Sequence, residues 1–158
     1  MTDSILVPID FSDVSDAVVA EAYKLARALD AGIVLVHVAM EKPGFLRHDT
    51  GSAAVRDSIA EHFKAEHQHL THYRDMLEEE GVEATAMLIP GSPAEKILDV
   101  ASRLQPALIL LGSHRHGALF YLLLGNVCQA VLRKAPCPVL IVPNQAVVAQ
   151  KLRSATGA

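Results

Sequence analysis

Cysteines and aromatic residues are scarce in this chain of 158 residues. The cysteines, Cys128 and Cys137, are too few for a disulfide framework and lack the CxxC spacing of metal and redox motifs, so we interpret them as reduced, half-buried side chains. Aromatic residues make up 4% of the sequence, with no tryptophan. This scarcity removes the stacking platforms on which single-stranded nucleic acids are bound.

The charge balance and the hydropathy pattern argue against two further roles. Lys and Arg number 14 and Asp and Glu 18, a formal charge of −4, while 51% of the residues are hydrophobic. This composition argues against disorder and against a basic nucleic-acid binder. No apolar run approaches the roughly 20 residues of a membrane helix, and the start, MTDSILVPIDF, lacks the pattern of a secretion signal. We therefore predict a cytoplasmic protein without membrane insertion.

Short aliphatic runs predict the strands of a sheet. Each run is continuously apolar rather than alternating, which indicates strands covered on both faces, and such strands are usually parallel. The length of the chain fits one domain built around them. The predicted strands are Ile5–Val7, Ile33–Val38, Ala84–Ile89, Leu108–Leu111 and Val139–Val142.

Two helical patterns occupy the first half of the chain. We expect Ser12 to cap the first helix and Gly32 to break it. An irregular loop at 41–52 precedes the second helix, which ends at Gly81. Their apolar faces are predicted to contain Val18, Ala22, Leu25 and Leu29 in the first helix, and Ile59, Phe63, Leu70 and Leu77 in the second.

The second half of the chain continues the alternation of strand and helix. A third helix is predicted to begin near Pro93 and to stop before Pro106, and a fourth follows Gly125. The alternation predicts an α/β fold, an open, doubly wound, five-stranded parallel sheet with right-handed crossovers and helices on both faces. The third helix is expected to bury Ile97, Leu98, Ala101 and Leu104.

One loop has the features of an anion site, although the familiar motifs are absent. The sequence contains no GxGxxG after a strand, no GxxxxGK[ST], no HExxH and no GxSxG. The segment from Gly112 to Val127 joins a predicted buried strand to a helix start. Free main-chain N–H groups and the helix dipole favour an anion at such a junction.

Three motifs resemble those of the universal stress protein family. They are Ile5-Leu6-Val7-Pro8-Ile9-Asp10, Leu35-Val36-His37-Val38 and Pro136-Cys137-Pro138-Val139-Leu140-Ile141-Val142-Pro143. The resemblance implies one universal stress protein domain over 1–143 and the strand order 3-2-1-4-5 of adenine nucleotide alpha hydrolase-like folds. The remaining segment, 144–158, has little periodicity, and we expect a mobile tail there.

The resemblance also implies an adenine nucleotide, either ATP or else ADP or AMP, across the carboxyl ends of strands one and four. The topological switch point of such a sheet leaves a crevice at that place. Asp10 is expected to face the adenosine and the main chain of Val38 to hydrogen-bond adenine, while magnesium would be held through the phosphates alone. The other residues expected around the nucleotide are Pro8, Ile9, Gly112, Ser113, His114, Arg115, Gly125, Asn126 and Val127.

The loop departs from the nucleotide-binding branch of the family at two positions. That branch reads Gly, two residues, Gly, nine residues, Gly, then Ser or Thr, whereas this chain has Arg115 at the second glycine and Asn126 at the last position. An arginine forced into left-handed geometry would lose roughly 1–2 kcal/mol. A contact between its guanidinium and a triphosphate could offset that strain. Asn126 is expected to cap the following helix, as Ser would.

Other polar residues have simpler interpretations beside functional ones. Asp10 fits a turn with Ser12, although the resemblance favours a ligand contact. His114 and His116 fit a solvated loop better than a phosphate or metal site, because no third ligand is near in sequence. His37 is expected to be a hydrogen-bonded structural residue.

The long helix carries a stripe whose spacing can chelate zinc, although such a stripe is ordinarily an exposed or interfacial face. We favour the exposed or interfacial face. The stripe consists of His62, Glu66, His69 and Tyr73.

Three functions stay open. The leading hypothesis is a dimeric stress-response module that binds ATP or a related nucleotide and signals through an unidentified protein partner, with no enzyme activity required. A slow ATPase is the second, for which Asp10 is the one carboxylate that we can assign to the strand ends. A nucleotide-free scaffold is the third, because Arg115 and Asn126 depart from the family loop.

The family resemblance further implies a homodimer formed by the fifth strand. In such a dimer this strand pairs antiparallel with its copy, which covers an otherwise exposed apolar edge. The interface residues would be Val139, Leu140, Ile141 and Val142.

Overall fold

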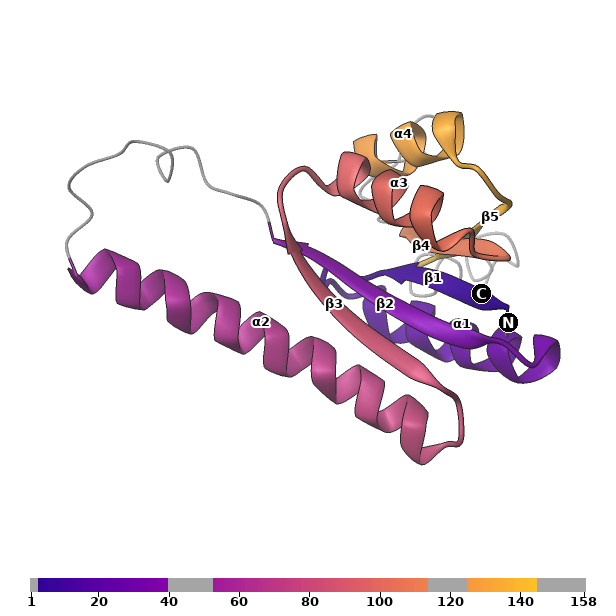
Figure 1. The fold of residues 1–158 in the computed structure, drawn as a ribbon, viewed down its shortest axis with the longest axis horizontal. Helices are drawn as coiled ribbons and strands as arrows, with labels where there is room; N and C mark the ends of the chain where they lie inside the picture. Colours follow the sequence, from indigo (N-terminus) through magenta and orange to yellow (C-terminus); the bar gives the residue numbers. More distant parts are fainter. Residues whose placement is uncertain (1–2, 40–52, 114–124, 145–158) are drawn as a thin grey trace, which may run out of the picture.

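The computed structural model describes residues 3–39, 53–113 and 125–144, with the main chain alone described at 53–59. Strands and helices alternate through these ranges (Figure 1). In chain order they are β1 (Ser4–Pro8), α1 (Ser15–Leu29), β2 (Gly32–Ala39), α2 (Ala53–Glu79), β3 (Ala84–Pro90), α3 (Pro93–Leu104), β4 (Leu108–Ser113), α4 (Asn126–Lys134) and β5 (Val139–Pro143).

The strands form one parallel sheet in the order β3-β2-β1-β4-β5, which confirms the predicted fold. β1 lies at the centre, between β2 and β4. The first three strands in the sequence lie on one side of the sheet, from β1 at the centre to β3 at the edge. The chain then crosses back to form β4 next to β1, and β5 at the opposite edge. Because this reversal separates the crossovers after β1 and β4, the sheet leaves room for a ligand at the carboxyl ends of these two strands.

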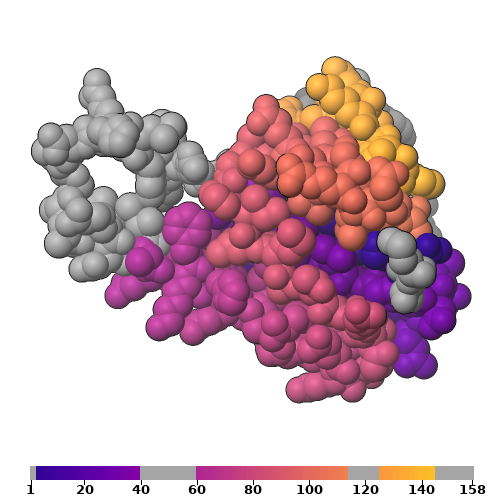
Figure 2. All heavy atoms as spheres, in the orientation of Figure 1, coloured from indigo at the N-terminus to yellow at the C-terminus, as the bar shows by residue number. Residues whose placement is uncertain are grey.

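Helices cover both faces of the sheet, with α1 and α2 on one side and α3 and α4 on the other (Figure 1). Successive strand side chains point to opposite faces. Ile5 and Val7 therefore pack with α1 and α2, whereas Leu6 packs with α3 and α4. This two-sided burial explains the continuously apolar runs, and little of β1 is visible in the space-filling view (Figure 2).

The boundaries of α1 differ from those predicted. Ser12 does not cap the helix, because the N-cap is Val14 and makes no side-chain cap hydrogen bond. The helix ends before Gly32, at Asp30, whose φ of 52° is left-handed. Asp tolerates that conformation better than most residues, and Gly32 instead begins β2. Leu29 was predicted to be buried but is 50% exposed.

The long helix α2 extends beyond the sheet. Its 27 residues span about 40 Å, whereas the 8 residues of β2 span about 26 Å. The part of α2 that packs on the sheet buries Leu70 and Leu77, and Gly81, with a φ of 78°, follows its end as predicted. Phe63 is only partly buried. No helix in the described ranges combines the length and hydropathy needed to cross a membrane.

We expect Leu70→Ala to lower the free energy of unfolding by about 2–5 kcal/mol, because it leaves a cavity beneath α2. Leu29→Ala removes the same atoms from a half-exposed site and should change the free energy by less than about 0.5 kcal/mol. Urea denaturation of both variants measures the difference. Equal losses would contradict the assignment of Leu70 to the core.

Candidate functional site

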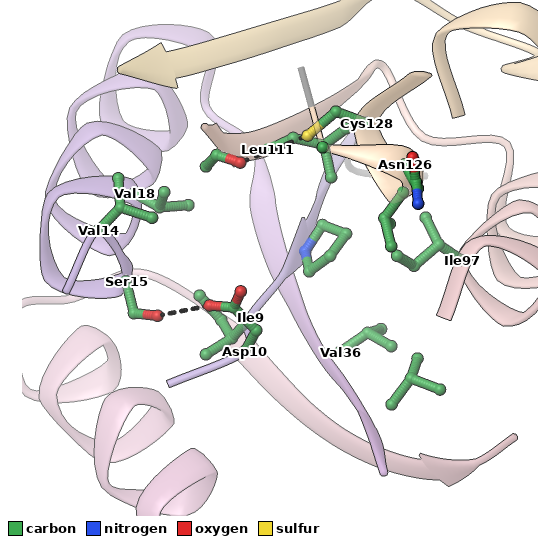
Figure 3. Close-up of a pocket in the computed structure, with 15 residues that line it drawn as sticks. Ile9, Asp10, Val14, Ser15, Val18, Val36, Ile97, Leu111, Asn126 and Cys128 are labelled. Carbon is green, nitrogen blue, oxygen red and sulfur yellow. Dashed lines mark hydrogen bonds between the residues drawn. The ribbon is translucent and has the colours of Figure 1, made fainter. Parts of the chain in front are cut away.

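A cavity of about 210 Å³ lies at the carboxyl ends of β1 and β4 (Figure 3). The turn after β1, the ends of β2 and β4, and the beginning of α4 contribute to its walls. Among the residues predicted to bind a nucleotide, those that line it are Pro8, Ile9, Asp10, Val38, Gly112, Gly125, Asn126 and Val127. The structure therefore brings together residues that are more than a hundred positions apart in the sequence.

One described site residue that was predicted, Ser113, is not among those lining the cavity. Ser113 is buried at the end of β4. His114 and Arg115 lie outside the described residues, as does His116. The other lining residues were not predicted from the sequence. They are Val14, Ser15, Val18, Val36, Ile97, Leu111 and Cys128.

The cavity is largely apolar and carries a few polar groups. Aliphatic side chains of α1, β2, α3 and β4 form most of its wall, while Asp10, Ser15 and Asn126 supply polar atoms. A concave apolar site with few polar groups is typical of small-molecule binding. The arrangement suits a ligand with a flat apolar part and a polar part.

The carboxylate of Asp10 is held by the turn between β1 and α1. Its Oδ1 accepts hydrogen bonds from the Ser12 amide at 3.1 Å, the Ser12 hydroxyl at 2.6 Å and the Ser15 hydroxyl at 3.3 Å. Figure 3 shows Asp10 and Ser15 pointing toward each other at the side of the cavity. The predicted turn with Ser12 is therefore present, and it fixes the direction of a carboxylate that lines the cavity.

The main chain of Val38 is directed toward the same region. The Val36 carbonyl accepts a hydrogen bond from the Ile9 amide at 2.8 Å, so the polar groups of Val36 point toward β1. The Ala39 carbonyl accepts one from the Gly91 amide, so the polar groups of Ala39 point toward β3. Residues of a strand bond to alternate neighbours. The N–H and C=O groups of Val38 therefore point to the side of β1, at a level where that strand has ended.

The two glycines at the cavity, Gly112 and Gly125, differ in whether packing requires a residue without a side chain. A Cβ added at Gly112 would lie 2.6 Å from Cγ1 of Val14 and 3.0 Å from Cγ2 of Val18, so this glycine permits close packing of β4 on α1. A Cβ at Gly125 would meet no atom within 4 Å in the described part of the chain. Its φ of −54° suits any residue. Gly125 is thus not required by packing in the described part.

The first turn of α4 faces the cavity. Gly125 is the N-cap, and Asn126 is the first helical residue. The expectation that Asn126 caps this helix is therefore wrong. The first intrahelical bond runs from the Gln129 amide to the Gly125 carbonyl at 3.0 Å. The amides before Gln129 have no acceptor within the helix, and with the helix dipole they favour an anion.

Cys128 contributes a protonated thiol to the wall. Its Sγ donates to the Gly112 carbonyl at 3.4 Å. Burial, reinforced by the negative charge of Asp10, raises the pKa of the Cys128 thiol above its usual value. Burial also raises the pKa of Cys137. Because a raised pKa favours the protonated thiol, both cysteines suit a packing role better than thiolate chemistry.

The stripe on α2 contacts the turn after β1 and the start of α1. His62 Nε2 lies 3.0 Å from Glu66 Oε1, and the ring of His69 stacks on Phe11. Tyr73 donates a hydrogen bond to Asp16 on α1. Burial, with the bond to Asp16 and its charge, raises the pKa of Tyr73. In the described residues this stripe is thus in part an interface within the fold.

Comparison with known proteins identifies the family. The model of the Universal stress protein family matches residues 1–143. The universal stress protein MJ0531 of Methanocaldococcus jannaschii is 33% identical over 139 residues, which are 87% of this chain and 80% of the relative. The chain belongs to the universal stress protein family.

Solved structures share the fold. The structure of protein MJ0577 aligns with a TM-score of 0.75 and 24% identity, covering 90% of this chain and 96% of that one. A universal stress protein of Archaeoglobus fulgidus, solved in complex with dAMP, has a TM-score of 0.60 and 23% identity over 88% of this chain and 96% of its own. A universal stress protein solved in complex with cAMP has a TM-score of 0.63 and 22% identity, covering 90% of this chain and 98% of that one.

Gly112→Ala should lower the free energy of unfolding by about 1–3 kcal/mol, because the new methyl group overlaps Val14 and Val18. Gly125→Ser is the matched control. It places a preferred N-cap residue before α4 and should leave the stability unchanged or slightly increased. Thermal and urea unfolding of both variants test this difference. A fully stable Gly112→Ala variant would contradict the packing role.

Proposed function

We propose that this protein is a stress-response module that binds ATP, or another adenine nucleotide, in the cavity between β1 and β4. The observation that carries the proposal is the placement of the Asp10 turn and the first turn of α4 around one apolar cavity at the switch point of the sheet. The complexes of family members with dAMP and cAMP support the class of ligand.

Each part of an adenine nucleotide has a complementary group in the described site. Adenine presents a donor and an acceptor on one edge, which match the N–H and C=O groups of Val38. The aliphatic wall around Val36 suits the faces of the base. The Asp10 carboxylate accepts hydrogen bonds from ribose hydroxyls, and the amides of the first turn of α4 bind phosphate oxygens. Magnesium would be held through the phosphates.

The two alternative functions depend on fewer features. Asp10 is the one carboxylate among the described lining residues, so a slow ATPase would have to orient water with it or with the phosphates themselves. The nucleotide-free scaffold depends on Arg115, which lies outside the described residues. A cytoplasmic location and a protein partner remain predictions from the sequence.

Asp10→Asn tests the nucleotide proposal. The amide retains an oxygen acceptor for the turn but removes the charge and an acceptor for ribose, so we expect ATP affinity to fall by about tenfold or more. Titration calorimetry with ATP, ADP and AMP measures the change. Asp99→Asn, on the exposed side of α3, is the control. Equal ATP binding by both variants would contradict the role of Asp10 in the site. No binding by the wild type at millimolar nucleotide would favour the nucleotide-free scaffold.

We also propose that β5 forms a homodimer with its copy. β5 is an edge strand of the sheet, paired with β4 on one side. Leu140 is 42% exposed, whereas Val142 is buried within the protomer. Antiparallel pairing of the two edges would satisfy the outer main-chain groups and cover Leu140.

Leu140→Lys should convert the dimer to monomers, because it places a positive charge on each of the two paired edges. Leu132→Lys, at a residue of α4 with a similar exposed fraction of 43%, should leave the dimer intact. Sedimentation velocity distinguishes these outcomes. A dimer that survives Leu140→Lys would refute this interface.

A further inference from the structure

Four rings from three parts of the fold form a continuous series of contacts beside the Asp10 turn, with a tilted pair at His37 and stacked pairs at His69. The Phe11 ring lies 4.4 Å from that of His37 on β2 and 4.5 Å from that of His69 on α2, measured between centroids. The His69 ring continues to Tyr73 at 5.5 Å. We call His37, Phe11, His69 and Tyr73 the ring ladder. It connects α2 to the residue that follows Asp10.

His37 fixes the peptide that enters Asp10. Its Nδ1 lies 2.7 Å from the Ile9 carbonyl oxygen, which can only accept, so Nδ1 carries the proton. The Ile9 amide is held in turn by the Val36 carbonyl. The Ile9 carbonyl belongs to the Ile9–Asp10 peptide and the Ile9 amide to the peptide before it, so residues of β2 hold one polar group of each of the two peptides that lead to Asp10.

Phe11 fixes the chain that leaves Asp10. Its φ of 58° lies in the left-handed region, which is unfavourable for a residue with a large side chain. Such a conformation persists where surrounding contacts hold it. The contacts here are the rings of His37 and His69.

Further contacts connect α2 to the same turn. Glu66 Oε1 lies 3.4 Å from His37 Nε2, and Tyr73 donates to Asp16 in the first turn of α1. Glu66 thus contacts the ladder at its β2 end, and Tyr73 connects its other end to α1. The turn that carries Asp10 is thus supported by α2 from both ends.

We propose that the ring ladder is a positioning device through which α2 holds the Asp10 turn and sets the affinity of the cavity for its nucleotide. This inference rests on the proposed function. His69 is the positioning residue on α2, because it touches Phe11 and lies outside the cavity lining. By linkage, a nucleotide that tightens the Asp10 turn also tightens the stack of Phe11 on His69.

The test measures ATP affinity by calorimetry, with magnesium present, in three variants at exposed positions of α2. His69→Ala removes the stacked ring and should weaken ATP binding by about two- to tenfold. His69→Phe restores a ring at the same place and should restore wild-type affinity. His67→Ala, on the same helix, is the control and should bind as the wild type does.

A His69→Ala variant that binds ATP as tightly as the wild type would overturn the inference, as would failure of His69→Phe to restore affinity while the unfolding temperature recovers. A loss of stability without a loss of affinity would show a role in folding alone.

A second measurement separates this inference from the proposed function. Hydrogen exchange at the Ser12 amide, which donates to Asp10, reports the turn without any ligand. If the wild-type protein binds no nucleotide, the proposed function fails. Faster exchange of the Ser12 amide in His69→Ala but not in His67→Ala would then still support the ladder as the element that positions the turn. Equal exchange in both variants would overturn it.

Discussion

The candidate site depends on the short length of the central strand. β1 pairs with β2 up to Pro8 opposite Val36, while β2 continues to Ala39. Because β1 ends first, the main chain of Val38 points across an empty strand position rather than into a ladder of hydrogen bonds. The turn after β1 then brings Asp10 to the edge of that space. The end of β4 and the start of α4 close it from the other side, so the cavity is a direct consequence of sheet order and strand length.

The strands were predictable because strands that are buried on both faces have aliphatic residues at successive positions of the sequence. Helix ends were less predictable, since side chains compete for the same backbone groups. The Ser12 hydroxyl donates to Asp10 instead of capping α1, and α1 ends at Asp30, in the left-handed conformation, rather than at the predicted Gly32. Leu29 continues the helical periodicity but is half exposed. Helical periodicity predicts which face of a helix is apolar, whereas the burial of each residue on that face depends on which part of the fold lies opposite it.

The candidate site was predictable in part. Family motifs led to Asp10, Val38 and Gly112, and all three line one cavity. They did not reveal why Gly112 must be small, because its neighbours Val14 and Val18 are packed against it only in the folded chain. The ring ladder was missed for the same reason. His37 and His69 could be interpreted individually as structural or exposed residues, and only the fold brings both into contact with Phe11.

The left-handed conformation of Phe11 has a consequence for the autonomy of the β1–α1 unit. Glycine would adopt this backbone shape on its own, so a glycine-containing turn could be transplanted between related sheets as a short segment. With phenylalanine, the shape is maintained by partners on β2 and α2 that are distant in sequence. The minimal portable unit is therefore not the loop but the loop together with the long helix, and chimeras that exchange one without the other would inherit a misaligned carboxylate.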